Sequence, residues 1–248
     1  MSASRTARER VRAELVREIT RVARRQLGDA GAAGLSLRAV ARELGMVSSA
    51  IYRYFPSRDD LLTALIIDGY NAVGEAVERA DAASRDGGRA DDFLGRWLAV
   101  CRAVREWALA HPHEYALLYG SPVPGYEAPT DTVPAAVRDT VVFSRIVSEA
   151  YAAGAVRTPD DDPPPVPSSM VESLGGVRTM VGLDVPDDVI ARALTAWAGL
   201  YGTVSFELFG QFNDVIDARA DHFDHTMTLL GRVMGLRAAP PPVSDESD

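Results

Sequence analysis

Residues 36–62 read Ser-Leu-Arg-Ala-Val-Ala-Arg-Glu-Leu-Gly-Met-Val-Ser-Ser-Ala-Ile-Tyr-Arg-Tyr-Phe-Pro-Ser-Arg-Asp-Asp-Leu-Leu, and this stretch decides the fold. Ser36 is placed to cap a short helix, and Gly45 allows a sharp turn after it. A second short helix is predicted over 48–55, because Pro56 disfavours helical backbone in the residue before it. Two short helices joined by a tight turn form a helix-turn-helix, whose second helix fits a DNA major groove.

One side of this motif is apolar and the other side is polar. Small Ala41 allows the two short helices to cross closely, and Ile51 packs from the second helix into the same interior. Phe55 is expected to join that core, whereas Tyr54 suits either interhelical packing or a DNA contact. Four side chains able to reach phosphates or base edges stay on the outer side: Ser48, Ser49, Tyr52 and Arg53.

Helical periodicity covers most of the remaining chain. Further helices are predicted over residues 7–28, 57–79, 91–110, 112–119, 133–153, 168–181, 186–212 and 214–236. Residues 1–8 are expected to form a mobile basic arm. Gly and Pro residues predict a surface loop over 120–134 and an exposed excursion over 157–168.

The fold class that follows is all-α, with an N-terminal three-helix helix-turn-helix domain and a larger helical domain for ligand binding and dimerisation. The DNA-binding domain is expected over residues 1–60 and the larger domain over 61–237. Residues 238–248 are expected to be a disordered tail.

Charge is divided unevenly along the chain. The whole chain has a formal net charge of −9, but residues 1–60 contain 12 Arg against 7 acidic residues. Residues 61–248 contain 14 Arg against 28 acidic residues. A basic end on an acidic body suits a DNA-binding head joined to a sensing or dimerising part, although the arginines alone would also suit a solvated helix face.

The sequence lacks the residues that several kinds of chemistry require. The single Cys101 excludes an intramolecular disulfide and a cysteine-cluster metal site, and it fits a reducing cytoplasm. The sequence contains no phosphate-binding glycine loop, no Gly-x-Ser-x-Gly elbow, no signal-peptide core and no run of 18 apolar residues. We therefore expect a cytoplasmic protein that is not an enzyme, spans no membrane and holds no metal or cofactor.

The spacing over residues 40–61, Val-Ala-x-x-x-Gly-x-x-x-x-x-Ile-Tyr-x-Tyr-Phe-x-x-Arg-x-x-Leu, resembles the DNA-binding signature of TetR-type transcriptional repressors. Tyr52 follows Gly45 by seven positions, as in that family. The resemblance is tight over residues 10–62. Residues 111–126, and Trp197 followed by Tyr201-Gly202, resemble the ligand-domain class named for its Trp-His-Gly motif.

The resemblance implies a set of DNA-binding residues. Phosphate contacts are implied for Ser36 and Tyr52. A place near bases or flanking phosphates is implied for Arg38, Ser48, Ser49 and Arg53. The helix 4 entrance, which would hold the DNA backbone, contributes Tyr54 and Arg58.

Three positions depart from the family pattern. Val47 replaces a small hydroxyl residue, so Ser48 is expected to cap the second short helix instead. Tyr54 replaces the usual His, and Arg58 replaces the usual Lys. These changes are compatible with the fold, but they prevent the operator sequence from being inferred from the family.

Two predicted helices carry more apolar surface than one small core buries. One stripe comprises Ile190, Leu194, Trp197, Tyr201, Val204 and Leu208. A second stripe comprises Val189, Ala193, Ala196, Leu200 and Thr203, and the last helix carries Phe223, Met227, Leu230 and Met234. We expect one stripe to face a second copy of the chain in a four-helix interface, as the resemblance also implies. A buried internal helix pair is the alternative.

A high density of Trp and Tyr in the middle helices predicts a pocket for a small apolar effector, because these side chains combine apolar bulk with a polar tip. Each aromatic taken singly also suits an ordinary core position. The predicted lining is Trp97, Cys101, Trp107, Tyr115, Leu118, Tyr119, Phe143, Trp197 and Tyr201.

The sequence thus predicts a homodimeric repressor that binds a palindromic double-stranded DNA operator and is released by a small apolar molecule. A dimer would place two recognition helices in successive major grooves, about 34–36 Å apart. A ligand that re-angles the fourth helix would disturb that spacing and lower DNA affinity by linkage. The alternative is a helical binding protein that keeps the head but has lost operator recognition.

Overall fold

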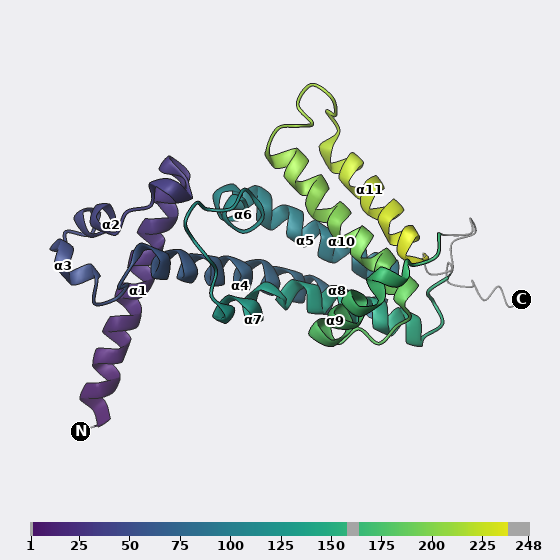
Figure 1. Cartoon of the computed structure of the whole chain (residues 1–248), viewed down its shortest axis with the longest axis horizontal. Helices are drawn as coiled ribbons and strands as arrows, with labels where there is room; N and C mark the ends of the chain where they lie inside the picture. The colour runs from purple at the N-terminus through teal and green to yellow at the C-terminus, as the bar shows by residue number, and fades with distance from the viewer. Residues whose placement is uncertain (1, 158–163, 238–248) are drawn as a thin grey trace, which may run out of the picture. The chain divides into compact units, whose positions relative to one another are not determined.

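The computed structural model describes residues 2–157 and 164–237, which form eleven α-helices and no β-strand (Figure 1). The all-α prediction is therefore confirmed. The predicted excursion at 157–168 lies partly outside the described residues, and the predicted tail at 238–248 lies wholly outside them. None of the described helices has the length and apolar character to span a bilayer.

The chain divides into two compact units. The first contains Met1–Ala72 and His111–Ala136, and the second contains Val73–Ala110 and Val137–Asp248. A segment from the middle of the chain therefore belongs with the N-terminal helices. The predicted domain limits at residues 60 and 237 stay predictions.

The first unit begins with the long helix α1 (Ser2–Ala30), followed by α2 (Leu37–Glu43), α3 (Ser48–Ile51) and the start of α4 (Arg58–Ser84). The prediction of a mobile arm over residues 1–8 is wrong for its described part, because α1 already starts at Ser2. Ala and Arg, which are strong helix formers, make up four of the seven residues over 2–8 and favour continuation of the helix towards the N-terminus.

The core of this head unit brings together the apolar faces of α1, α2, α3 and α4. Ile19, Val40, Ile51 and Leu61 are all fully buried in one cluster. The predicted core position of Phe55 is confirmed, since only 6% of it is exposed. These contacts explain why such short helices are stable, because tertiary packing rather than propensity supplies most helical stability.

The segment 111–136 completes the first unit. It contains α6 (Pro112–Tyr119), a 3-10 turn over Thr130–Thr132 and the short α7 (Val133–Ala136). Helix α6 packs closely on α1, where a Cβ atom on Gly28 would lie 3.2 Å from the His113 ring. It also packs closely on α4, where a Cβ atom on Gly69 would lie 3.2 Å from Leu118.

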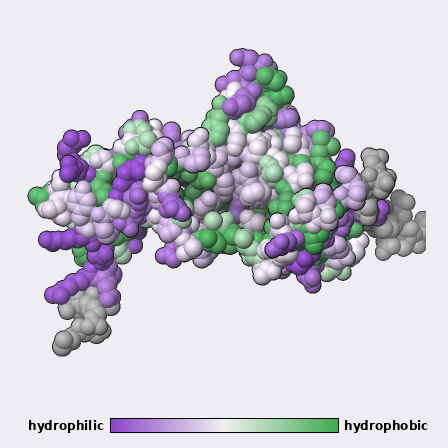
Figure 2. Space-filling view, in the orientation of Figure 1, coloured by the Kyte–Doolittle hydropathy of each residue, from purple (hydrophilic) through white to green (hydrophobic). Residues whose placement is uncertain are grey.

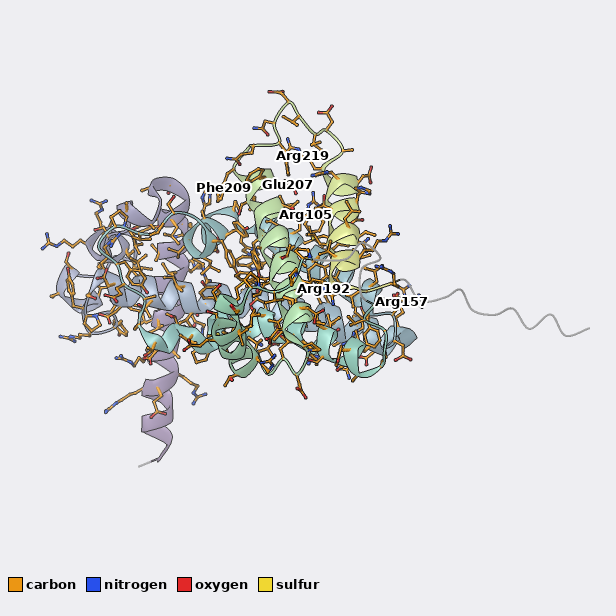
Figure 3. All side chains as sticks on the ribbon, turned by 45° about the vertical axis from the view of Figure 1, so that its right-hand side comes forward. Arg105, Arg157, Arg192, Glu207, Phe209 and Arg219 are labelled. Atoms are coloured by element: carbon orange, nitrogen blue, oxygen red, sulfur yellow. The ribbon has the colours of Figure 1, made fainter. Side chains whose placement is uncertain are left out.

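The second unit contains α5 (Phe93–Ala110), α8 (Arg138–Ala152), α9 (Val171–Val181), α10 (Asp187–Leu208) and α11 (Arg219–Met234). Helices α10 and α11 run side by side in opposite directions (Figure 1). Arg105 on α5 holds Glu207 on α10 by two hydrogen bonds of 2.7 and 2.6 Å (Figure 3).

Two predicted helices have different limits in the structure. The helix predicted over 133–153 is broken at Val137, where α7 and α8 are separated. The last helix starts at Arg219 rather than residue 214, because Gly210 and Asp214 adopt left-handed backbone with φ values of 84° and 58°. Arg219 stabilises this turn by donating to the carbonyl oxygens of Phe212 and Ile216.

A buried ionic network joins three helices of the second unit. Arg96 on α5 is 1% exposed, and its Nε donates to Asp81 Oδ1 on α4 at 2.8 Å. Its Nη1 donates to Glu149 on α8 at 2.6 Å, and Arg145 on α8 also donates to Asp81. Buried charges of this kind are stable only when their hydrogen-bonding capacity is satisfied.

The expected division of α10 into a core stripe and a partner stripe is wrong. Members of both predicted stripes are buried in the protomer, including Ile190 and Val204 of the first stripe and Val189 and Leu200 of the second. The reason is that α10 contacts α5, α9 and α11 on different sides. A third stripe remains exposed instead: Ala198, Gly202, Phe206 and Phe209.

Candidate nucleic-acid interface

The turn between α2 and α3 is a Schellman motif. Met46 N–H donates to the carbonyl oxygen of Ala41 at 2.8 Å, and Gly45 N–H donates to that of Arg42 at 3.1 Å. Gly45 has a φ of 66°, which a side chain would strain. The motif satisfies the last carbonyls of α2 and turns the chain sharply into α3.

Helix α3 is shorter than predicted. It spans only Ser48–Ile51, and a tight turn carries the chain on to Phe55. Val47 occupies the N-cap position and makes no side-chain cap, so the expectation that Ser48 replaces the missing cap is wrong. Ser48 lies one position inside the helix, where its backbone is already helical. Ile51 is fully buried and anchors this single turn in the head core.

The structure exposes most of the predicted DNA-binding side chains. Ser48, Ser49, Tyr52 and Arg53 are all exposed around the one turn of α3. Arg38 is exposed on α2. These five residues therefore lie where a nucleic acid can reach them.

The remaining predicted residues have structural roles as well. Ser36 caps α2 by accepting a hydrogen bond from Ala39 N–H at 3.5 Å, as expected from the sequence. Arg58 is half-buried, and its Nη2 donates to the carbonyl oxygen of Ala32 at 2.8 Å. Tyr54 is half-buried and packs against the head core. A DNA contact by Tyr54 or Arg58 would add to these internal contacts.

A groove of about 760 Å³ lies beside the Schellman turn. Its lining is Ser36, Arg38, Ala39, Arg42, Met46, Val47 and Ser48. Arg38 and Arg42 are separated by one helical turn of α2, and both are exposed. Neither forms a salt bridge with a described residue, so both guanidinium groups are available to phosphate. Arg42 was not among the DNA-binding residues expected from the sequence, although its spacing of four residues from Arg38 places both on one face of α2.

Arg12 on α1 supports the turn that follows α3, at residues 52–54. Its Nη1 donates to the carbonyl oxygen of Arg53 at 3.3 Å, and its guanidinium lies 5.4 Å from the centre of the Tyr54 ring. Arg12 could not be identified from the sequence, because Arg12 and Arg53 are 41 positions apart and no local pattern relates them.

The nine predicted effector-binding residues fall into both compact units. Tyr115, Leu118 and Tyr119 lie on α6 in the first unit, where the rings of Tyr115 and Tyr119 are 4.9 Å apart. Leu118 also lines a separate cavity in that unit. Tyr115 is fully buried.

The other six lie in the second unit. Trp97 contacts Phe143 with ring centres 5.5 Å apart, and its indole N–H donates to the carbonyl oxygen of Met227. The Trp197 and Tyr201 rings are also 5.5 Å apart, and the Tyr201 hydroxyl donates to buried Asp139. Cys101 and Trp107 are buried, whereas Trp197 is 39% exposed. Burial raises the pKa of the Cys101 thiol well above its ordinary value, as expected for an unreactive core cysteine.

Comparison with known proteins follows the same two-part organisation. A family model described as bacterial regulatory proteins of the tetR family matches residues 19–65. A second, described as a tetracyclin repressor-like C-terminal domain, matches residues 97–230.

Individual proteins are similar over almost the whole chain. The HTH-type transcriptional regulators Rv1816 of Mycobacterium tuberculosis and Mb1846 of Mycobacterium bovis are each 44% identical to it, covering 93% of this chain and 94% of the relative. The crystal structure of regulatory protein SCO4313 is similar with a TM-score of 0.72 and 34% identity, covering 90% of this chain and 97% of that one. A protein of unknown function from Rhodococcus sp. RHA1 has a TM-score of 0.63 and 27% identity, covering 89% and 93%.

Proposed function

Because the chain belongs to the TetR family of transcriptional regulators, we propose that it is a repressor, that it binds a palindromic operator as a homodimer, and that a small apolar molecule releases it. DNA binding and transcriptional regulation follow from family membership. Dimerisation, repression, release by an effector and action in the cytoplasm, where a bacterial chromosome lies, are the added proposals.

The observation that carries the DNA-binding part is the exposure of one side of α3. Buried Ile51 anchors the single turn, and the Schellman motif fixes its direction. Tyr52 and Arg53 follow that turn and are exposed, so their hydroxyl and guanidinium groups point away from the core. A Tyr hydroxyl donates well to phosphate, and an Arg binds a guanine edge or phosphate through two hydrogen bonds.

The experiment is a salt titration of binding to a labelled duplex from the region upstream of the gene for this chain. Specific binding should weaken steeply with salt, because bound arginines release counterions from the DNA. Arg53→Ala should lower affinity by roughly 5- to 150-fold, which corresponds to 1–3 kcal/mol. Tyr52→Phe should lower it by roughly two- to tenfold, the worth of one hydrogen bond.

Matched substitutions in the second unit serve as controls. Arg85→Ala and Tyr151→Phe remove the same groups from exposed positions, and both should bind the duplex like the unmodified protein. If the unmodified chain binds the upstream duplex no better than a scrambled one, the repressor proposal fails. The alternative, a helical binding protein that keeps the head but has lost operator recognition, would then be favoured.

The exposed stripe of α10 supports the homodimer. Ala198, Gly202 and Phe206 follow one another at steps of four residues and share one face of α10, and exposed Phe209 caps the end of this helix three residues later. Leu229 and Val233 on neighbouring α11 are 47% and 40% exposed. Figure 2 shows hydrophobic surface where α10 and α11 are joined. Two antiparallel helices with such faces suit a self-complementary four-helix interface.

Gly202 is the most informative residue of that stripe. A Cβ atom on Gly199 would lie 2.7 Å from Leu230, so packing inside the protomer requires that glycine. A Cβ atom on Gly202 would meet nothing within 4 Å, yet glycine costs a helix interior about 1 kcal/mol relative to alanine. Close approach of a second helix gives a reason for glycine at this position.

Sedimentation velocity tests the dimer. Gly202→Arg and Phe206→Glu should each convert the dimer to monomer at micromolar concentration, because each buries an unpaired charge in the interface. Met180→Glu is the matched control, since Met180 on α9 is 64% exposed and lies outside the stripe. If both stripe variants remain dimeric, the dimer interface does not involve this stripe.

Release by an effector is supported by the buried aromatic contacts of the second unit and by the cavity of the first. Any molecule that binds the DNA-free form more tightly must lower DNA affinity by the same factor. Screening small apolar compounds for loss of duplex binding tests this part directly. A protein whose duplex affinity no such compound changes would be a constitutive regulator.

A further inference from the structure

A separate cavity lies inside the first unit. It has a volume of about 240 Å³. Its walls come from α4, α6, α7 and the segment between α6 and α7: Ile66, Tyr70, Leu117, Leu118, Pro122, Val123, Tyr126, Ala128, Thr132 and Ala136. Only Leu118 was among the effector-binding residues expected from the sequence.

The walls of this cavity are apolar with a few hydroxyl groups. The ten described lining residues carry no charged side chain. Ile66 and Thr132 are buried, whereas Pro122 and Ala128 at the rim are exposed. The Tyr70 ring lies in edge contact with Tyr119, 6.0 Å between centres. Such walls disfavour an ion, because burying an unpaired charge is costly.

Tyr126 supplies a defined polar group. Its hydroxyl lies 2.9 Å from Thr63 Oγ1 on α4, and either group is able to donate. When one hydroxyl donates to the other, the pair keeps one O–H donor and spare acceptor lone pairs. Thr132 Oγ1 already donates to the carbonyl oxygen of Pro129 at 2.7 Å, so it offers only acceptor capacity.

The size of the cavity restricts its occupant. An engineered apolar cavity of about 150 Å³ accommodates benzene. The volume of about 240 Å³ therefore suits one aromatic ring with a few further atoms. A neutral ring with a single hydroxyl would bury its apolar part against Ile66 and Leu118 and exchange a hydrogen bond with Tyr126.

The same walls also support the DNA-binding head. Leu117, Val123 and Tyr126 line the cavity and pack against the hydrophobic cluster that contains Ile51 and Leu61. Ile66 and Tyr70 continue α4, the helix whose Leu61, Leu62 and Leu65 belong to that cluster. An occupant that shifts these walls would therefore act on the cluster in which Ile51 anchors α3.

We propose that this cavity is the effector site, that it takes a neutral monocyclic aromatic compound with one hydroxyl group, and that occupancy weakens DNA binding through the walls it shares with the head core. The inference rests on the proposed function, because it locates the ligand that releases the repressor. It differs from the sequence-based expectation, which drew the pocket mainly from residues of the second unit.

The first experiment measures binding without DNA. The probes are 4-ethylphenol and 4-ethyltoluene, which match in shape and differ in the hydroxyl, and binding to the full-length protein is followed by ligand-observed NMR. 4-Ethylphenol should bind at least tenfold more tightly. Tyr126→Phe should reduce that preference at least threefold while leaving 4-ethyltoluene binding unchanged.

Filling the cavity provides the second arm. Ala136→Trp should abolish binding of both probes, and the smaller Ala136→Val should weaken it by a lesser factor, which guards against a variant that fails to fold. Ala83→Trp places the same side chain at an exposed position of α4 in the second unit and should leave binding unchanged. Probe binding that is absent, or equal in the Ala136→Trp and unmodified proteins, overturns the site.

The third arm adds the upstream duplex. Saturating 4-ethylphenol should lower duplex affinity at least fivefold in the unmodified protein and have no effect on Ala136→Trp. Probe binding that leaves duplex affinity unchanged overturns the effector role. An unrelated compound that releases Ala136→Trp and the unmodified protein equally would overturn this site while leaving the repressor proposal intact.

Discussion

Arg12 on α1 is hydrogen-bonded to the main chain of Arg53, an exposed residue of the turn that follows α3. The Arg12 Nη1 atom lies 3.3 Å from the Arg53 carbonyl oxygen, and the same guanidinium lies over the Tyr54 ring. Because α3 ends at Ile51, Arg53 lies beyond the helix, and the Arg12 side chain supplies a donor to its carbonyl oxygen. The long helix α1 thus contacts and supports the turn that follows α3.

Arg12→Ala should therefore weaken duplex binding several-fold while leaving the salt dependence of binding unchanged. A residue that positions Arg53 changes the affinity, whereas one that contacts phosphate itself would also reduce the salt slope by about 1. Arg12→Lys should recover only part of the loss, because an ammonium lacks the planar fork of Arg. Arg17→Ala, at an exposed position of the same helix, is the control, and equal losses in both variants would contradict the positioning role.

The start of α4 depends on a reciprocal cap between Ser57 and Asp60. Asp60 Oδ2 accepts from the Ser57 N–H at 2.8 Å, and Ser57 Oγ accepts from the Asp60 N–H at 3.1 Å. Asp60→Ala should cost about 1 kcal/mol, the usual worth of a helix cap. Thermal unfolding should show a decrease of roughly 2–4 °C. Asp59 makes neither of these cap contacts, so Asp59→Ala should lower the unfolding temperature less than Asp60→Ala does.

Arg96 should be among the most sensitive positions of the second unit. Arg96→Met leaves Asp81, which is fully buried, without one of its two arginine partners. Breaking one side of a buried ion pair costs about 3–5 kcal/mol, and urea unfolding should reveal it. Arg102→Met removes an exposed pair with Asp224 and should cost at most about 1 kcal/mol. Similar losses in the two variants would show that the buried network contributes little.

Asp139 should make part of the stability depend on pH. Burial raises its pKa, and hydrogen bonds from the Tyr201 hydroxyl and Thr140 N–H offset this effect only in part. The folded protein therefore binds this proton more tightly than the unfolded chain. Its contribution to stability falls as the pH rises from the ordinary Asp pKa of about 3.9 through the raised value.

Urea unfolding of Asp139→Asn across that pH range measures the effect. The stability of the unmodified protein relative to Asp139→Asn should decrease as the pH rises. A parallel pH dependence of stability in the two proteins would rule out this contribution of Asp139. Tyr201→Phe removes a donor to the charged form, so at neutral pH it should cost about 1.5–3 kcal/mol. Tyr151→Phe, at an exposed position, should have little effect.

The head could be predicted from the sequence because its determinants are local. Ser36 as a cap, Gly45 as a turn and Ile51 as the anchor of α3 each act within a few residues, and the structure confirms all three. The end of α3 was less predictable. Residues 52–54 contain no helix-breaking residue, and the contacts of Arg53 and Tyr54 in this turn come from Arg12 on distant α1.

Other features depend on residues that are far apart in the chain. Nothing between residues 111 and 136 indicates that this segment packs with the head, since the packing partners of α6 lie on α1 and α4. The cavity built by Tyr126, Ile66 and Ala136 could therefore not be read from spacing. The exposed face of α10 was predicted wrongly for the same reason, because three other helices decide which of its residues are buried.

The amino-acid sequence alone determined the kind of protein: its helical class, the turn at Gly45 and the polar side of α3 all follow from short-range backbone preferences and local periodicity. Tertiary packing decided which side chains support that turn, which face of α10 stays uncovered and where a cavity opens. Those outcomes depend on volume and contact between distant segments, which local patterns do not specify.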